Sequence, residues 1–143
     1  MISYCLKRLN TTLKTDMIQK GSKLGVIDNS GARFVSCIHV SGGYRRRYAF
    51  TGDTIVVSVK KLRNQRKLLS KVKKGEIIKA LIIRTKTGLK SYSAEHLTFK
   101  ENSVVLFSKQ NKLIGTRLFG TIPSHFRYTR YLKLVSLASG FAY

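Results

Sequence analysis

Hydrophobic and polar positions alternate along most of this chain, but residues 77–83 are apolar almost without interruption, with Lys79 as the exception. Because side chains alternate across a β-strand, Ile78, Ala80 and Ile82 would share one face and the odd-numbered apolar positions the other. A strand that is apolar on both faces lies centrally in a packed sheet or forms one stave of a small closed barrel. Cations cluster at both ends of this strand, so the pattern predicts a β core with cationic rims.

Shorter alternating stretches on both sides of this strand predict a mainly β protein. They cover residues 18–27, 33–41, 54–61, 104–107 and 113–119, and groups of turn-forming residues separate them. Short strands at such regular spacing are typical of a small barrel or a sandwich. In residues 33–41 the alternation assigns six side chains to two faces, with Val35, Cys37 and His39 on one and Phe34, Ile38 and Val40 on the other.

The period of the apolar positions changes near the C-terminus. Tyr131, Leu134, Val135 and Ala138 are spaced as i, i+3, i+4 and i+7, which predicts a short amphipathic helix. Ser124, which follows the only proline, is the expected N-cap. The pattern therefore predicts a β core followed by a small helical region.

The charge of the chain indicates what its surface binds. There are 28 Lys and Arg against 6 Asp and Glu, a formal net charge of +22, and the pI is about 10.5. Such an excess repels itself unless a polyanion neutralises it, and each phosphate contact releases counterions. The composition therefore predicts a nucleic-acid partner.

Arginine alternates with aromatic residues in two stretches, residues 44–48 and 126–131. Guanidinium and ring faces in such stretches can stack on exposed bases or sugars. The alternative is that these tyrosines pack on the edge of the barrel. Phosphate contact is expected in either case.

Other function classes find little support in the residues. The six acids are scattered singly and the three histidines are far apart, so we expect no enzyme activity. Cys37 and His39 lack a second pair at zinc spacing, so no metal or cofactor is expected and Cys37 is expected to be a small core residue. We expect Cys5 and Cys37 to be free thiols in a reducing compartment. No apolar run reaches the roughly 18 residues of a membrane span, so no membrane partner is expected.

Many motifs between Met17 and about Ala138 occur in the order seen in one family. The chain resembles the universal large-subunit ribosomal protein fourteen family of the bacterial and organellar type. The motifs are Met17-Ile18-Gln19, Asp28-Asn29-Ser30-Gly31-Ala32-Arg33, Cys37-Ile38, Gly42-Gly43, Arg46-Arg47-Tyr48-Ala49, Gly52-Asp53, Lys71-Val72-Lys73-Lys74-Gly75, Lys79-Ala80, Arg84-Thr85-Lys86, Ile114-Gly115-Thr116-Arg117 and Phe119-Gly120.

The resemblance implies a small five-stranded β-barrel of the oligonucleotide-binding type, with a β-ribbon and a short C-terminal helical region. It also implies a non-catalytic protein that binds large-subunit ribosomal RNA, lies on the face that meets the small subunit, and contributes to bridges to small-subunit ribosomal RNA. The implied protein partners are the ribosomal proteins three and nineteen and, in bacteria and organelles, the ribosome-silencing factor.

The chain departs from the family pattern in several places. The loop of residues 62–70 is longer and adds cations, and Ser93-Ala94 and Lys100-Glu101-Asn102 replace turns that usually contain glycine. Tyr128 and Thr129 replace acids of the C-terminal region, where the silencing factor would dock. We expect residues 1–16 to be a retained basic extension and residues 17–143 to form a single barrel domain with a C-terminal helix.

We expect ribosomal RNA contacts from cations on several loops and strand ends. The predicted contacts are Arg33, Arg45, Arg46, Arg47, Lys60, Arg63, Arg66, Lys73, Lys74, Arg84, Lys86 and Arg117. A second, more weakly supported set is predicted for the intersubunit side: Lys90, Arg127 and Arg130.

An alternative function is a free single-stranded-nucleic-acid-binding module of the same barrel type, acting as a chaperone or regulator. Sedimentation through a density gradient separates the two hypotheses, because only a ribosomal protein travels with a subunit. The chain is rich in Lys, Ile, Leu, Tyr, Phe and Ser and has no Trp, as in a gene of low GC content. We therefore expect an organelle-encoded mitochondrial protein, with a plastid or a bacterial cytoplasm left open.

Overall fold

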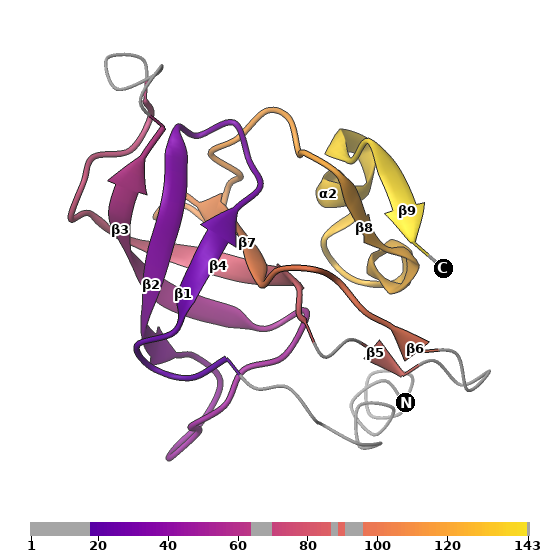
Figure 1. Cartoon of the computed structure of the whole chain (residues 1–143), viewed down its shortest axis with the longest axis horizontal. Helices are drawn as coiled ribbons and strands as arrows, with labels where there is room; N and C mark the ends of the chain where they lie inside the picture. Colours follow the sequence, from indigo (N-terminus) through magenta and orange to yellow (C-terminus); the bar gives the residue numbers. More distant parts are fainter. Residues whose placement is uncertain (1–17, 64–69, 87–88, 91–95, 143) are drawn as a thin grey trace.

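Five strands close into a barrel in the computed structural model, which describes residues 18–63, 70–86, 89–90 and 96–142 (Figure 1). Around the barrel they are β1 (Lys23–Val26), β2 (Ala32–Val40), β3 (Thr54–Leu62), β4 (Ile77–Arg84) and β7 (Ser103–Phe107). Neighbouring strands are antiparallel, except that β1 and β7 close the barrel in parallel. The predicted fold class, mainly β with a five-stranded barrel and a short helix near the C-terminus, is confirmed.

Strand β4 is buried on both faces over residues 80–83, as its sequence predicts. Ala80 and Ile82 belong to the core inside the barrel, whereas Leu81 and Ile83 belong to a second cluster on the outer wall. The prediction fails at the start of the strand, where Ile77 is 63% exposed because the outer cluster does not extend to it.

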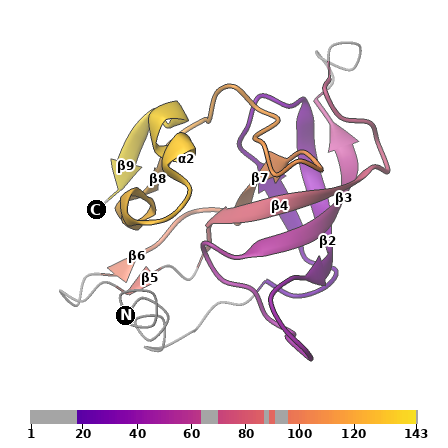
Figure 2. The ribbon, with the colours of Figure 1, turned by 180° about the vertical axis from the view of Figure 1, so that it is seen from behind.

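The outer wall of β4 and β7 is covered by the C-terminal segment (Figure 2). This segment contains β8 (Thr121–Pro123), the 3-10 helix η2 (Ser124–Tyr128), the helix α2 (Leu132–Leu137) and β9 (Gly140–Ala142), and β8 pairs with β9 in parallel. Its buried side chains pack in the outer cluster with the outward residues of β7. They are Ile122, Phe126 and Leu134. This packing explains why every residue of β7 is buried.

A two-stranded ribbon, β5 (Leu89–Lys90) with β6 (His96–Leu97), lies outside the barrel (Figure 1).

The structure also bears on the expectation that no membrane is involved. Among the described residues, no helix is long and apolar enough to cross a membrane.

The predicted faces of β2 are wrong in its second half. Val35, Cys37 and Val40 all lie in the barrel core, while His39 is exposed. A bulge causes the change, because the register shifts between Cys37 and His39 where two residues of β2 oppose one of β3. The extra residue reverses the alternation, so Cys37 and His39 do not share a face.

The strand predicted for residues 113–119 does not form. A strand needs successive bonds to one partner, but the N–H groups here bond to three different segments: Ile114 to Leu106, Leu118 to Leu137, and Phe119 to Ile27. Leu113 and Leu118 form only isolated bridges.

The predicted C-terminal helix is present but shorter than expected. α2 spans Leu132–Leu137, so Tyr131 and Ala138 flank it as caps. Ser124 is not the N-cap of this helix, because it begins the separate helix η2, which has Pro123 at its N-cap and no capping side chain. The break between η2 and α2 divides a stretch whose spacing suggests one helix.

Replacing Leu81 with alanine should lower the free energy of unfolding by about 2–5 kcal/mol, because the truncation leaves a cavity between the barrel and the C-terminal segment. Ile77→Ala on the same strand is the matched control and should change it by about 0.5 kcal/mol or less, since Ile77 is exposed. Urea unfolding measures both. Equal losses would contradict the two-sided burial of β4.

Candidate nucleic-acid interface

The turn of residues 28–31 is built around a buried carboxylate. The Asp28 side chain is fully buried, and its Oδ1 accepts hydrogen bonds from the backbone N–H and the hydroxyl of Ser30, the former at 2.9 Å. Its Oδ2 accepts the N–H of Leu106 on β7 at 2.9 Å. One side chain therefore shapes the turn and fastens it to the barrel.

Gly31 lets this turn approach the next segment closely. Its φ is +96°, a left-handed conformation that side chains with a Cβ disfavour, and an added Cβ would lie 2.6 Å from the Cβ of Ser70. No other residue fits this position without moving the backbone that leads into Lys71.

Three segments that carry cations are hydrogen-bonded to the same turn. The N–H of Arg63 donates to the carbonyl of Gly31 at 2.9 Å, and the N–H of Lys71 donates to that of Ser30 at 2.9 Å. The N–H of Asn29, the second residue of the turn, donates to the carbonyl of Arg117 at 3.2 Å. We call Arg63, Lys71 and Arg117 the turn cluster.

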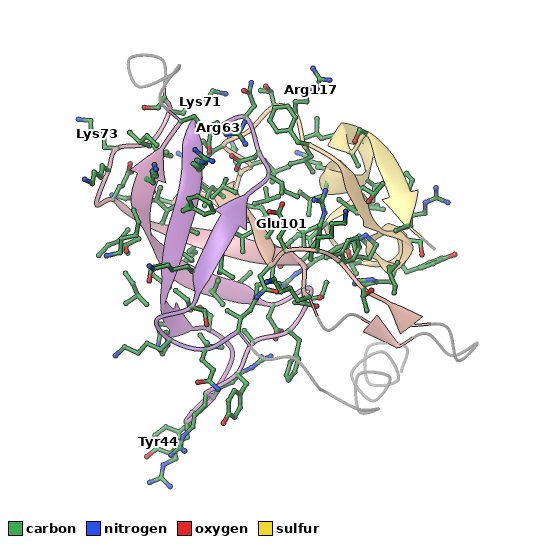
Figure 3. The ribbon with its side chains drawn as sticks, in the orientation of Figure 1. Tyr44, Arg63, Lys71, Lys73, Glu101 and Arg117 are labelled. Carbon is green, nitrogen blue, oxygen red and sulfur yellow. The ribbon has the colours of Figure 1, made fainter. Side chains whose placement is uncertain are left out.

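The side chains of the turn cluster lie at one end of the barrel (Figure 3). The guanidinium carbons of Arg63 and Arg117 lie 5.0 Å and 5.7 Å from the ring centre of Phe119, so one ring orients two cations. The Lys71 ammonium donates to a backbone carbonyl, that of Ile114, at 3.0 Å. None of the three forms a salt bridge within the described part of the chain.

A second group of cations lies at the opposite end of the barrel, in the loop of residues 41–48, whose tip is marked by Tyr44 in Figure 3. We call this the arginine loop. Arg45 and Arg47 are exposed, whereas Arg46 is half-buried and pairs with Asp53. Arg46 also donates from Nε to the carbonyl of Tyr48 at 3.1 Å. The predicted RNA contacts are thus separated into at least two groups.

Comparison with known protein families identifies the family of this chain. A family model described as ribosomal protein L14p/L23e matches residues 17–142. The chain belongs to this family. It is therefore a structural protein of the large ribosomal subunit, located in the ribosome, with ribosomal RNA and ribosomal proteins as its partners.

One predicted contact of this L14p/L23e protein, Arg84, is largely engaged within the protein. Its guanidinium donates to the carbonyls of Thr121 and Phe119, each at 2.7 Å, and Glu101 lies 4.0 Å away. Burial lowers the pKa of Arg84, and the charge of Glu101 opposes this shift. Arg84 thus joins the end of β4 to the C-terminal segment and has few donors left for a phosphate.

The remaining predicted contacts are spread over the surface. Exposed members are Arg33 on β2, Lys60 on β3, Lys73 and Lys74 before β4, and Lys86 after it. Of the intersubunit set, Arg127 lies 4.1 Å from the ring centre of Phe141 and Arg130 lies 5.1 Å from that of Tyr131. Lys90 is in β5, where only the backbone is described, and Arg66 lies outside the described residues.

Sequence reasoning missed two residues of the candidate interface, Lys71 and Phe119. Lys71 belongs to the basic run of residues 71–74, but nothing in that run shows that its backbone bonds to the turn. Phe119 is part of a family motif, and its place beneath two guanidinium groups depends on segments distant in sequence.

The structure also shows the environment of the residues weighed as metal ligands. Cys37 is a buried free cysteine in the barrel core, as predicted, and burial raises the pKa of its thiol. His39 is exposed. Among the described residues, no three His, Cys, Asp or Glu side chains are grouped so that they could hold a metal ion. Cys5 lies outside the described residues.

Asp28→Asn should lower the free energy of unfolding by about 1–3 kcal/mol, because an amide has one acceptor oxygen and leaves a buried N–H unpaired. Urea unfolding measures this, and hydrogen exchange should become faster at the Leu106 amide. Glu101→Gln is the control and should change stability by about 0.5 kcal/mol or less, since Glu101 is 60% exposed and 4.0 Å from Arg84. Equal effects would show that Asp28 does not organise the turn.

Proposed function

We propose that this protein binds large-subunit ribosomal RNA directly through phosphate contacts at both ends of its barrel. The observation that carries the proposal is the turn cluster, in which a turn held by buried Asp28 brings together Arg63, Lys71 and Arg117 from three separate segments. Cations fixed by backbone hydrogen bonds lose less conformational freedom on binding than cations on free loops.

The charge of the chain supports the same partner. A formal net charge of +22 over 143 residues is neutralised when the cations of the protein displace the counterions around the RNA phosphates. Asp28, the carboxylate around which the turn is built, is buried and used in hydrogen bonds, so it does not offer a competing surface anion.

The cations that we assign to RNA contact are of two kinds. The turn cluster and the arginine loop present exposed or half-exposed cations on fixed backbone, while others stand singly along strands and turns. The assigned residues are Arg33, Arg45, Arg46, Arg47, Lys60, Arg63, Arg66, Lys73, Lys74, Arg84, Lys86 and Arg117, and we add Lys71 because its backbone is bonded to the same turn.

A second surface is assigned to the face of the large subunit that meets the small subunit. Arg127 and Arg130 carry exposed positive charge on the C-terminal segment, and with Lys90 they would contact small-subunit RNA. Neighbouring proteins of the three and nineteen families complete the proposed partners. The ribosome-silencing factor would dock beside α2, where Tyr128 and Thr129 replace the acids of relatives.

The ribosome that contains this protein is proposed to be mitochondrial, with the gene in the organelle. The support is compositional: the chain is rich in residues encoded by A and T, and it has no Trp. Mapping the gene to nuclear DNA would contradict only its encoding in the organelle, and mapping it to a plastid or bacterial genome would move the ribosome to that compartment.

Removing the two arginines of the turn cluster should flatten the salt dependence of RNA binding. In the full chain carrying Arg63→Ala and Arg117→Ala, the slope of log Kd against log salt should fall by about 0.7–0.9 for each phosphate that the variant no longer neutralises. A transcript of the large-subunit ribosomal RNA is the probe, titrated at several KCl concentrations. Lys133→Ala on α2 is the control and should leave the slope unchanged.

The arginine loop should behave in the same way. Arg46→Ala with Arg47→Ala should leave the barrel folded and reduce the slope by about 0.7–0.9 for each phosphate left without its arginine. Of the two single variants, Arg47→Ala should reduce the slope more, because Arg47 is exposed whereas Arg46 already pairs with Asp53. An unchanged slope in both double variants, or a wild-type protein that does not bind the transcript at low salt, would refute the proposal.

A further inference from the structure

Tyr44, at the tip of the arginine loop, is the most exposed of the large hydrophobic side chains that the structure describes. It is 90% exposed, against 41% for Phe34 and 37% for Tyr48. Figure 3 shows it projecting from the barrel at the end opposite Arg63. A ring in this position makes almost no contribution to the core, so its role must be sought outside the protein.

The base of the arginine loop is braced by Arg46. This side chain pairs with Asp53 and donates to the carbonyl of Tyr48, both of which follow it on the returning side of the loop. It also lies against Gly42, whose φ is +118° and where an added Cβ would be 2.5 Å from Nη1. Asp53 in turn accepts the N–H of Phe50 at 2.8 Å.

The returning leg of the loop is fastened to the barrel. Ala49 exchanges two backbone hydrogen bonds with Ile18, at 3.0 Å and 2.9 Å, and Gly52 donates to the carbonyl of Ile82 at 2.9 Å. The loop is therefore supported along its base and its return, and the tip is held away from the barrel surface.

The tip itself presents one face of the tyrosine ring. Arg45 has a φ of +56°, which is unusual for a residue other than glycine. Its guanidinium carbon lies over one face of the Tyr44 ring, 5.2 Å from the ring centre. The other face is open to solvent, and Arg47 adds a further exposed cation nearby.

We propose that Tyr44, backed by Arg45, is a stacking platform for one unpaired nucleobase of RNA. The inference rests on the proposed function, that the protein binds ribosomal RNA. Aromatic rings and guanidinium planes both stack on bases, and a base within a helix has no free face to offer, so the ligand is a base in a loop, bulge or single strand.

The charges around the tip favour RNA over a protein partner. Asp53, the acid that supports the loop, is already paired with Arg46, and Arg45 and Arg47 remain exposed beside the ring. A polyanion brings phosphates to these two cations while its base lies on the ring. An apolar protein surface would leave both cations without compensation.

The test compares Tyr44→Ala and Tyr44→Phe in the full chain, with a large-subunit ribosomal RNA transcript as the probe. Loss of the ring should weaken binding at fixed salt by roughly 5- to 150-fold, whereas phenylalanine keeps a stacking face and should stay within about twofold of wild type. The salt dependence should not change in either variant, because no cation is removed. Ile77→Ala, which removes an exposed apolar side chain (63% exposed) outside both arginine–aromatic stretches, is the control and should bind like wild type.

A second readout locates the base. Ultraviolet crosslinking of the wild-type complex should join the peptide containing Tyr44 to a nucleotide that is unpaired in the RNA, and the crosslink should be absent from Tyr44→Ala. Unchanged urea unfolding in Tyr44→Ala shows that the weaker binding is not a folding defect.

Three results would overturn the platform. These are wild-type affinity in Tyr44→Ala, an equal loss of affinity in Tyr44→Phe, which would indicate a hydroxyl hydrogen bond, or a crosslink to a base-paired nucleotide. If the wild-type protein binds the transcript with the expected salt dependence and Tyr44→Ala does too, the proposed function stands and only the platform fails. If the wild type does not bind, both fail.

Discussion

The hydrogen bonds of the buried Asp28 carboxylate are the interaction on which the cationic surface depends. Burying a carboxylate is costly unless donors replace its water, and here Ser30 supplies two and Leu106 a third. The donors come from the turn and from strand β7, so the carboxylate both fixes the conformation of the turn and fastens the turn to the barrel. The surface proposed to bind RNA is thus organised by a carboxylate that is itself buried.

The arginines of this acid-poor chain have two kinds of role. Arg46 and Arg84 each pair with one of the few carboxylates and bond to backbone carbonyls, so they shape the arginine loop and the junction with the C-terminal segment. Arg45, Arg47 and Arg117 keep their charge at the surface. Two of the few acids therefore hold two guanidinium groups in place within the protein.

Much of the fold could be predicted because the burial of side chains within one strand follows from the sequence of that strand. Much of the site could not be predicted, because it depends on contacts between segments that are distant in sequence. The alternation of β3 and the two apolar faces of β4 survive in the structure, since each follows from side-chain direction within one strand. The bulge of β2 depends on its pairing with β3, and the failed strand at residues 113–119 depends on where its N–H groups find acceptors. Asp28 was predictable as a turn former, but its bond to Leu106, 78 residues away, was not.

The parallel pairing of β1 with β7 has a consequence for how the chain is made. The first and last strands of the barrel must meet before the wall is complete, and β7 leaves the ribosome only after β2, β3 and β4 have been synthesised. Until then the growing polypeptide has an open sheet with unpaired edges, which invites association with other chains.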